Sequence, residues 1–276
     1  MSLLEDTKIT AFLKNEVEQD ILKSAYSRIH DYHDPLRGPI FALLTRELLR
    51  IVMKRLAPDK DVAAASWCQG EPWTYVDTRD GSTKLTRASR YRFAITGTIS
   101  DAKLKEHPKL DCTVQIKELK DLVDKLSKFA HISPGTHGLS VTETNDFLHE
   151  VEVIMSDYVT KLIETKKHVA DIIFHLVDSK LNEHLMEEIP NELDELSSGT
   201  RIDGVMVEEL EDFDTSSAFL VLSGSGHTDV ELNYGGSSDR HSSEQSYPFQ
   251  FYVQIDPDTF DVSVDSVEVD TADFYE

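Results

Sequence analysis

The first half of the chain is dominated by apolar residues that recur every three or four positions. This spacing predicts amphipathic helices over about 3–29, 39–56, 83–95 and 112–130. Pro39 stands where the first turn of a helix accepts proline, and Pro58 ends the second helix. The segment 59–83 has no such period and contains the turn signal Asp80-Gly81, so it is expected to be irregular.

A longer helix is predicted after the capping signal Ser140-x-x-Glu143, because no proline or glycine follows until Pro190. A helix of about 40 residues would extend for roughly 60 Å. Three arrangements fit this length: a projecting helix, a bend near residues 164–167, or a dimer seam along 143–189. We favour the bend, and the seam would make the protein a homodimer.

After Gly199 the pattern changes to alternating apolar and polar residues, which is typical of strands with one buried face. About five short strands are expected, over 205–207, 218–222, 229–234, 249–255 and 260–264, with turns at GSGH, GGSSD and DPDT. The sequence therefore predicts an α+β protein, with a helical N-terminal region over residues 1–198 and a small antiparallel β-sheet domain over 199–276.

The charge of the protein is distributed very unevenly. The chain of 276 residues holds 28 Lys+Arg and 51 Asp+Glu, and its net charge of −23 argues against a protein that coats nucleic acid or anionic lipid. Residues 199–276 hold 2 basic and 18 acidic residues, residues 142–198 hold 4 and 14, and residues 1–141 hold 22 and 19. A site for an anionic partner therefore belongs in the first half.

Several function classes are excluded or disfavoured. No apolar stretch approaches the roughly 20 residues of a membrane span, and the first residues lack a secretion signature, so we expect a cytoplasmic protein without a membrane partner. Cys68 and Cys112 are too few for a metal box and are expected to be buried thiols. Signatures of phosphate loops, zinc proteases and serine hydrolases are absent. No metal site is predicted and the cofactor stays undefined, with Mg²⁺ still open.

Arginines provide the main candidate chemistry. Arg46 and Arg50 lie one turn apart on the polar side of the helix over 39–56, and Arg87 and Arg90 are similarly spaced on the next predicted helix. Arginine forms bidentate pairs with phosphate and with carboxylate alike. As a set, these residues predict either a phosphate-binding surface or a series of ion pairs with nearby carboxylates.

Two histidine motifs are also candidates. His131 ends a helix three residues after Lys128, where an imidazole could act as a general acid/base or could cap its own helix. Arg28-x4-His33 has the R-x4–6-H spacing of HEPN ribonucleases, but this spacing is common by chance and an exposed helix end is the favoured interpretation.

Longer motifs resemble those of a known protein family. The chain contains, in order, DPLRGPIFALLTRELLRIVMKRLAP, SWCQGEPW, KLTRASRYRFAITGTISD, LVDKLSKFAHISPGTHG, ELDELSSGTRIDGVMVEEL, VELNYGGSSDR and SYPFQF. From about residue 24 to 256, this order and spacing resemble the predicted pPIWI-associating nuclease family of prokaryotic defence loci. The resemblance implies a nuclease-like defence effector. The polar residues that match its motifs are Arg37, Glu47, Arg87, Arg90 and His131.

We therefore expect a defence protein whose helical region acts on RNA or DNA, alongside a partner protein of the same defence system. The candidate residues are, as catalytic groups, His131 and Arg37; as nucleic-acid-binding groups, Arg46, Arg50, Arg87 and Arg90; and as structural groups, Glu47 and Lys128. The alternative is a non-enzymatic regulatory or adaptor module whose acidic β domain masks or mimics nucleic acid.

Overall fold

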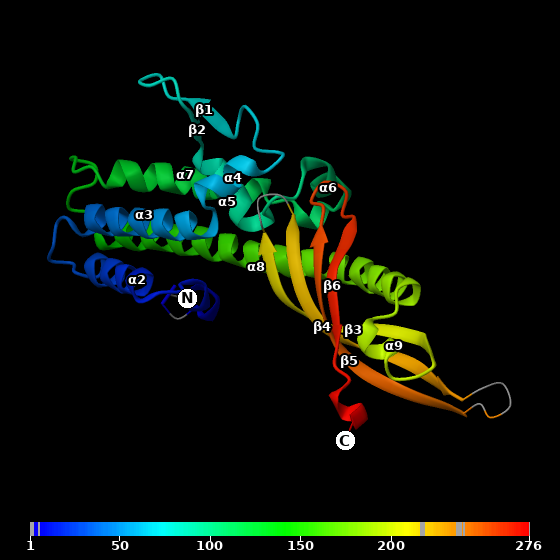
Figure 1. The fold of residues 1–276 in the computed structure, drawn as a ribbon. Coiled ribbons are helices and arrows are strands. Elements are labelled where there is room, and N and C mark those ends of the chain that lie inside the picture. Colours follow the sequence, from blue (N-terminus) through cyan, green and yellow to red (C-terminus); the bar gives the residue numbers. More distant parts are fainter. Residues whose placement is uncertain (1–2, 5, 216–218, 236–238, 240, 276) are drawn as a thin grey trace. The chain divides into compact units, whose positions relative to one another are not determined.

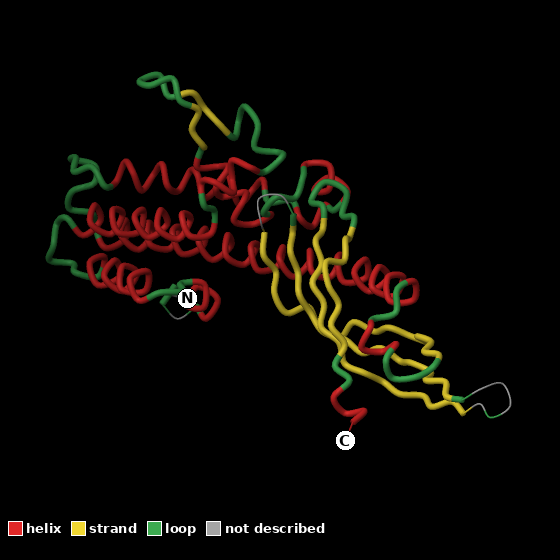
Figure 2. The backbone as a smooth tube through the Cα atoms, in the orientation of Figure 1, coloured by secondary structure: helices red, strands yellow, loops and turns green. Residues whose placement is uncertain are grey.

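The computed structural model describes residues 3–4, 6–215, 219–235, 239 and 241–275, without the side chains of 211–215, 273 and 275. The chain packs as two compact units. The helical unit comprises residues Met1–Gly97 and His107–Lys166, and the sheet unit comprises Thr98–Glu106 and Lys167–Glu276. Figure 1 labels the elements, and Figure 2 distinguishes helices from strands.

The helical unit contains helices and one small hairpin. In chain order its elements are α1 (Thr7–Phe12), α2 (Glu16–Ile29), α3 (Arg37–Leu56), α4 (Asp59–Ala64), β1 (Thr74–Val76), β2 (Thr83–Leu85), α5 (Arg87–Thr96), the short 3₁₀ helix η1 (Pro108–Leu110), α7 (Thr113–Phe129) and the first part of α8 (Val141–Glu187).

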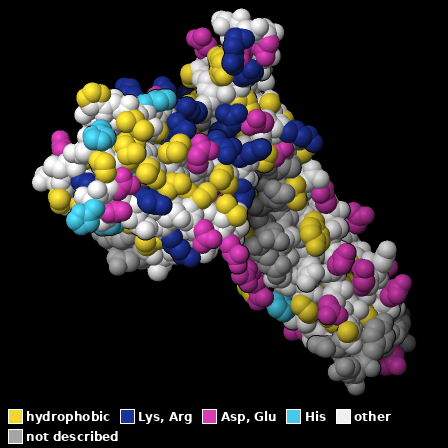
Figure 3. All heavy atoms as spheres, turned by 90° about the vertical axis from the view of Figure 1, so that its left-hand side faces the viewer, with side chains coloured by type: hydrophobic (Ala, Val, Ile, Leu, Met, Phe, Trp, Pro, Cys, Tyr) yellow, Lys and Arg dark blue, Asp and Glu magenta, His cyan; other side chains and the backbone are white. Residues whose placement is uncertain are grey.

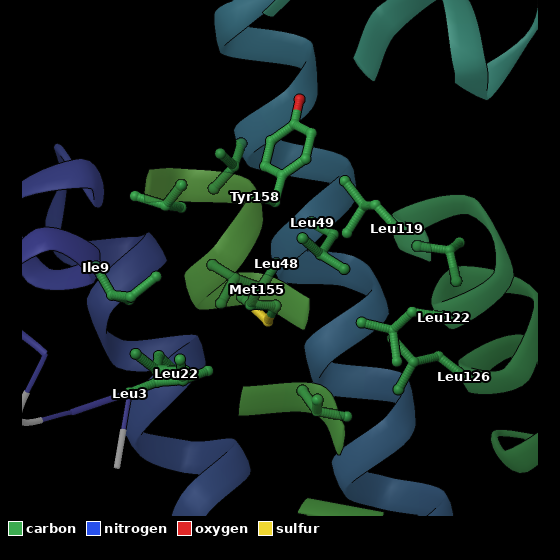
Figure 4. Packing of buried hydrophobic residues seen from close by; sticks show 14 of the residues in the cluster. Leu3, Ile9, Leu22, Leu48, Leu49, Leu119, Leu122, Leu126, Met155 and Tyr158 are labelled. Carbon is green, nitrogen blue, oxygen red and sulfur yellow. The ribbon is translucent and has the colours of Figure 1, made fainter. Parts of the chain in front are cut away.

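The core of this unit lies between α2, α3, α7 and α8. Leu22, Leu48, Leu122 and Met155, one from each of these helices, are buried in a single cluster (Figure 4). Complete burial of such a side chain contributes about 1.5–3 kcal/mol. Tyr158 is also buried there, and its hydroxyl donates a hydrogen bond of 2.8 Å to the carbonyl of Tyr91. The apolar stripes predicted from the sequence are therefore the surfaces that form this core.

The prediction of one helix over 3–29 is wrong, because the helix is interrupted between Phe12 and Glu16. Asn15 caps α2, and its side chain accepts a hydrogen bond of 2.9 Å from the amide of Glu18. The Glu18 carboxylate in turn accepts from the amide of Lys14 at 2.9 Å. These two hydrogen bonds satisfy backbone amides at the start of a helix, which have no partner within the helix. They stabilise the start of α2 at Glu16, although the apolar spacing continues across the interruption.

The prediction that a helix starts near Thr83 is also wrong. Residues Thr83–Leu85 form β2, which pairs with β1, and α5 begins only at Arg87. Thr86 separates the two elements because its hydroxyl accepts from the amide of Ser89 at 3.2 Å and so caps α5. The predicted turn at Asp80-Gly81 is confirmed, with Gly81 at a φ of +69°.

The helices predicted around 112–130 and after residue 140 are confirmed. The capping box is present, with the Glu143 amide donating to Ser140 Oγ at 3.2 Å and the Ser140 amide donating to the Glu143 carboxylate at 2.9 Å. Helix α8 is uninterrupted for 47 residues, about 70 Å. The division between the two units falls between Lys166 and Lys167, within α8. The bend near residues 164–167 stays a prediction.

The sheet unit contains α6 (Asp101–Glu106), the second part of α8, α9 (Asn191–Asp194), β3 (Gly199–Thr215), β4 (Leu220–Tyr234), β5 (His241–Ile255), β6 (Val262–Val269) and the 3₁₀ helix η2 (Ala272–Tyr275). The four strands β3 to β6 pair in sequence order, each antiparallel to the next. The predicted fold class, α+β with a helical region followed by an antiparallel sheet, is confirmed.

The prediction of five short strands with a turn at GSGH is wrong. The residues Ser223–His227 run through the middle of β4, which pairs with β5 without a break. The glycines of this segment serve packing, because a Cβ at Gly224 or Gly226 would collide with the ring of Phe251 or Phe249. The predicted turn at DPDT is confirmed, whereas Ala218 and most of the predicted GGSSD turn lie outside the described residues.

The division between the units differs from the predicted boundary at 198/199. The second part of α8 belongs with the sheet, and Asp178 on this part accepts a hydrogen bond of 3.2 Å from the Val207 amide of β3. A one-layer sheet must cover its apolar face, and α8 supplies a stripe for this purpose. The buried residues of the stripe are Val169, Ile173, Val177, Leu181 and Leu185. The sequence also allowed a dimer seam along 143–189, but this part of the helix buries its apolar stripe within a single chain.

Candidate functional site

The outer face of α3 presents a row of basic side chains. Arg46, Arg50 and Lys54 follow one another at intervals of four residues, which places them on one side of the helix. Phe41, Leu48 and Val52 occupy the buried side. The amphipathic pattern of α3 therefore fixes the direction of these cations, as the sequence predicted.

Helix α5 brings two more arginines to the same region. The Arg90 Nε donates to Asp59 of α4 at 2.9 Å, and the Arg87 Nη1 donates to Asp124 of α7 at 2.8 Å. Both ion pairs join α5 to a neighbouring helix. The start of α5 at Arg87 matters here, because it places both arginines in the first turns of the helix, beside α3, α4 and α7.

Two adjoining pockets connect these residues into one surface. The first has a volume of about 540 Å³ and is lined by α3 and α5, and the second has a volume of about 810 Å³ and extends to β2 and α7. Both are lined by Asp59, Arg87 and Arg90. We call this surface the basic groove and define it by its charged residues: Arg46, Glu47, Arg50, Lys54, Asp59, Lys84, Arg87, Arg90, Lys120 and Asp124.

The basic groove is positive within a strongly acidic protein. Seven of its ten charged residues are basic and three are acidic, a net of +4, whereas the whole chain has a net charge of −23. Figure 3 shows dark-blue Lys and Arg side chains gathered near the base of the projecting β1–β2 hairpin, with acidic side chains among them. Such a local excess of cations attracts anions whatever the net charge of the protein.

Two carboxylates of the groove, Glu47 and Asp59, are held ionised by neighbouring arginines. A hydrogen bond of 2.7 Å from Arg50, supported by Arg46 at 3.4 Å, lowers the pKa of Glu47 below its usual value of 4.5. The hydrogen bond from Arg90 likewise lowers the pKa of Asp59, with a further contribution from the charge of Lys54. These are exposed or half-exposed ion pairs, which contribute little free energy and can be replaced by a phosphate.

The remaining lysines differ in how they are paired. Lys84 forms ion pairs with Asp77 and Asp80 of the hairpin. Lys54 and Lys120 form no ion pair with any carboxylate in the described part of the chain. Both lysines can therefore bind an incoming anion without breaking an ion pair with a described residue, and Lys54 acts on Asp59 through its charge alone.

Arg37 does not line the basic groove. Its side chain is buried, with 4% of the residue's surface exposed, and it binds the protein itself. Nε donates to Thr144 Oγ1 at 3.2 Å, Nη1 donates to the carbonyl of Tyr32 at 3.1 Å, and Nη2 donates to the carbonyl of Leu139. The guanidinium thereby fastens the start of α3 to the loop over 131–140 and to α8.

His131 and Lys128 are exposed and also lie outside the residues that line the groove. His131 follows the end of α7, seven residues after Asp124, which corresponds to about 10 Å along a helix. Its carbonyl accepts a hydrogen bond of 2.9 Å from the hydroxyl of Thr136. Of the predicted site residues, the structure brings together Arg46, Glu47, Arg50, Arg87 and Arg90, and it does not bring His131, Lys128 or Arg37 to them.

Sequence reasoning missed several groove residues. Asp59 was overlooked because its segment has no apolar period, although α4 begins directly after Pro58. Lys84 was assigned to a helix and lies on a strand. Tyr91 lines the first pocket, and burial raises its pKa to about 12. The signal that could have found Tyr91 is its position between two arginines in the segment RASRYR.

We also searched the described residues for metal ligands, reactive thiols and membrane-spanning helices. Nowhere in residues 3–4, 6–215, 219–235, 239 and 241–275 do three or more His, Cys, Asp or Glu side chains gather as metal ligands. Cys68 and Cys112 are buried free thiols, as predicted, and burial raises the pKa of Cys112 to about 11. Among the described helices, none is long and apolar enough to span a membrane.

Comparison with known proteins gives one consistent result. Two family models match the chain, over residues 10–158 and 162–275, and both carry the description predicted pPIWI-associating nuclease. No match was found among curated proteins or among solved structures. The two matched segments together cover nearly the whole sequence, in agreement with the resemblance of its motifs.

Proposed function

Because the chain belongs to the predicted pPIWI-associating nuclease family, we propose that its basic groove binds the phosphate backbone of RNA or DNA and that the protein acts as a nuclease-like effector in prokaryotic defence. The observation that carries this proposal is the +4 charge of the groove within a chain of net charge −23. A polyanion that approaches this protein finds in the groove a concentrated set of cations.

The way the arginines are held suits a phosphate ligand. Arg87 and Arg90 come from one helix turn, and each already binds a carboxylate through its guanidinium. A phosphate oxygen offers the same acceptor geometry, so a bound backbone can take over these hydrogen bonds with the arginines already oriented. Lys54 and Lys120 then add charge without losing an ion pair with any described residue.

Cleavage would use the same cations to stabilise the extra negative charge of the transition state. Glu47 is the carboxylate of the groove that lies between two arginines, Arg46 and Arg50. The assignment of His131 as the general acid/base stays a prediction, and it draws no support from the groove because His131 does not line it. Mg²⁺ and a metal-free reaction are both tested below.

The first experiment measures binding and cleavage by the full chain. Labelled RNA and DNA strands of about 20 nucleotides, long enough for several groove contacts, are titrated with protein and followed by fluorescence anisotropy. The double variant Arg87→Ala/Arg90→Ala should bind at least about tenfold more weakly, because two phosphate contacts are lost. Arg28→Ala is the matched control, since Arg28 is exposed on α2 and does not line the groove.

Cleavage is followed on gels with Mg²⁺ or with EDTA, using the same strands. Loss of binding in the double variant with retention in Arg28→Ala supports the proposal. Equal affinities of the double variant, the control and the unmodified protein would contradict it.

The family description also supports a PIWI-like protein as a partner, which we include in the proposal. Co-purification of the full chain with a PIWI-like protein from the same locus is the expected result. Separate elution of the two proteins, with and without RNA, would contradict this part of the proposal.

One observation favours a second candidate function. Residues 199–276 hold 18 acidic and 2 basic residues, and Asp203, Glu209 and Asp229 are among those exposed to solvent. A non-enzymatic adaptor that mimics nucleic acid would use such a surface to bind a basic protein. This function predicts that the full chain binds neither RNA nor DNA in the titration above.

A further inference from the structure

The β1–β2 hairpin projects from the helical unit (Figure 1), and its residues Tyr75 and Lys84 line the second pocket of the basic groove. Its base is firmly attached. The amide of Thr86 donates to the carbonyl of Trp73 at 2.9 Å, and the Trp73 ring packs edge-on against Trp67 with 5.2 Å between centroids. The guanidinium of Arg92 lies over both rings, at 3.9 Å from the centroid of Trp67 and 4.9 Å from that of Trp73. The contacts of Trp73 thus attach the hairpin to the helical unit, whereas Tyr75, the next aromatic residue along the chain, is exposed to solvent.

The outer part of the hairpin is held by ion pairs. Asp77 is buried, with 5% of its surface exposed, and accepts from Arg79 Nη2 at 2.7 Å and from Lys84 Nζ. The turn itself is closed by hydrogen bonds between the backbones of Asp77 and Ser82 and of Gly81 and Asp77 at 2.8 Å. The hairpin is therefore ordered by its own contacts and needs no ligand to form.

Tyr75 is the aromatic side chain that this hairpin presents to solvent. Its ring is large, yet 48% of its surface is exposed, and it lines two pockets at the hairpin. One of these is the second pocket of the basic groove, which Arg87, Arg90 and Lys120 also line. Lys84 is directly opposite Tyr75 in the antiparallel pair, so the ring and this cation project from the same face.

An exposed ring beside a row of cations matches the two parts of a nucleotide. The cations bind the phosphate, and the ring stacks on a base, which every nucleotide offers as a flat surface. A base within a duplex is already stacked on its neighbours and is not free to lie on a side chain that approaches from outside. An unpaired base is free to do so.

We propose that Tyr75 is a stacking platform for an unpaired base and that the basic groove therefore prefers single-stranded over double-stranded nucleic acid. This inference rests on the proposed function, since it names the class of nucleic acid that the groove would bind. The phosphate contacts of the groove give the affinity common to both forms, and Tyr75 gives the difference between them.

The test compares labelled single strands with duplexes of the same sequence, both as RNA and as DNA, bound to the full chain. Tyr75→Ala should weaken the binding of the single strand by about tenfold and leave duplex binding unchanged, because the loss of one stacked base has this magnitude. Tyr75→Phe retains the ring and should retain the affinity. Tyr75→Leu retains apolar bulk without a π face and should behave like Tyr75→Ala.

Val76→Ala is the matched control. Val76 is 63% exposed on the next position of β1, so its side chain projects from the other face of the hairpin and it does not line the basic groove. The result that overturns the inference is equal binding of single strand and duplex, or unchanged single-strand affinity in Tyr75→Ala while Arg87→Ala/Arg90→Ala still weakens it. Failure of both forms to bind the unmodified protein would instead overturn the proposed function on which the inference rests.

Discussion

Two regions of the helical unit use arginine in opposite ways. In the basic groove, the side chain of Arg50 is 62% exposed and bonds the carboxylate of Glu47, which a phosphate can replace. At the start of the same helix, Arg37 is buried and donates to the backbone carbonyls of Tyr32 and Leu139, so its hydrogen bonds are made within the protein itself. The first arrangement suits binding, and the second holds the fold. The motif DPLRGPIFALLTRELLRIVMKRLAP contains both arginines, so its residues include some that stabilise the fold and some that are candidates for binding.

The largest effect that separates the two regions is expected for Arg37→Ala. The variant loses three hydrogen bonds from a charged group and leaves two carbonyls without their donor, so its free energy of unfolding should fall by about 3 kcal/mol or more. Both tryptophans of the chain, Trp67 and Trp73, lie in the helical unit, so tryptophan fluorescence during urea unfolding reports on this unit.

Arg50→Ala is the matched control for that measurement. Arg50 forms one exposed ion pair, so its loss should lower the free energy of unfolding by about 1 kcal/mol or less. Similar losses in Arg37→Ala and Arg50→Ala would mean that the two regions do not differ as described.

The next effect concerns binding rather than stability. Arg46→Ala/Arg50→Ala removes two cations from the groove, so the slope of log affinity against log salt for a single strand should fall by about 1.4. The measurement is a series of anisotropy titrations between low and physiological salt. An unchanged slope would show that nucleic acid does not contact these arginines.

Glu47→Gln is expected to raise the affinity for nucleic acid, whereas the arginine variants lower it, and the change should be smaller. Removal of this carboxylate frees Arg46 and Arg50 from their ion pairs, so affinity for nucleic acid should rise by about two- to fivefold, the scale of one exposed pair. If Glu47 takes part in cleavage, the rate of cleavage falls while affinity rises. Weaker binding in Glu47→Gln would contradict the proposed exchange of carboxylate for phosphate.

The pH dependence of binding follows from the same carboxylates. The pKa values of Glu47 and Asp59 lie below their usual 4.5 and 3.8, so both groups stay ionised from neutral pH down through these values. Their ion pairs are lost only as the pH falls through the lowered values, and the groove then becomes more positive. Affinity should therefore be constant between about pH 8 and pH 5 and should rise below about pH 4. A fall in affinity on acidification, measured by anisotropy, would contradict this sign.

The smallest effect on binding is expected for His131→Ala. His131 is exposed and does not line the groove, so affinity should change by less than about twofold and stability by less than about 0.5 kcal/mol. Cleavage assays with the same variant test the separate prediction of a catalytic role. Lost cleavage with intact binding supports that prediction, and unchanged cleavage contradicts it.

Much of the fold could be predicted from local signals. The amphipathic period of α3 and α7 and the Ser140-Glu143 capping box act within a few residues, and all three are present. Local signals failed where a distant contact decides the structure. Gly224 and Gly226 look like a turn, but the rings they face are in β5, about one strand later in the sequence.

The candidate site was predictable to a similar extent. Arg87 and Arg90 were predicted on one helix face, and the period of α5 is enough to place them there. The sequence could not predict that Arg37 is buried while Arg46 lines the groove. The burial of Arg37 depends on Leu139 and Thr144, about a hundred residues later. The role of Tyr75 depends on a hairpin that has no hydrophobic period of its own.

The most direct test of the central claim is the location of bound nucleic acid. A single strand with 4-thiouridine at defined positions is crosslinked to the full chain, and the modified peptides are identified by mass spectrometry. Crosslinks within residues 46–54, 75–91 and around Lys120 are expected, because these segments contribute the basic groove. Crosslinks confined to residues 131–140, or to the acidic strands after residue 199, would contradict the claim.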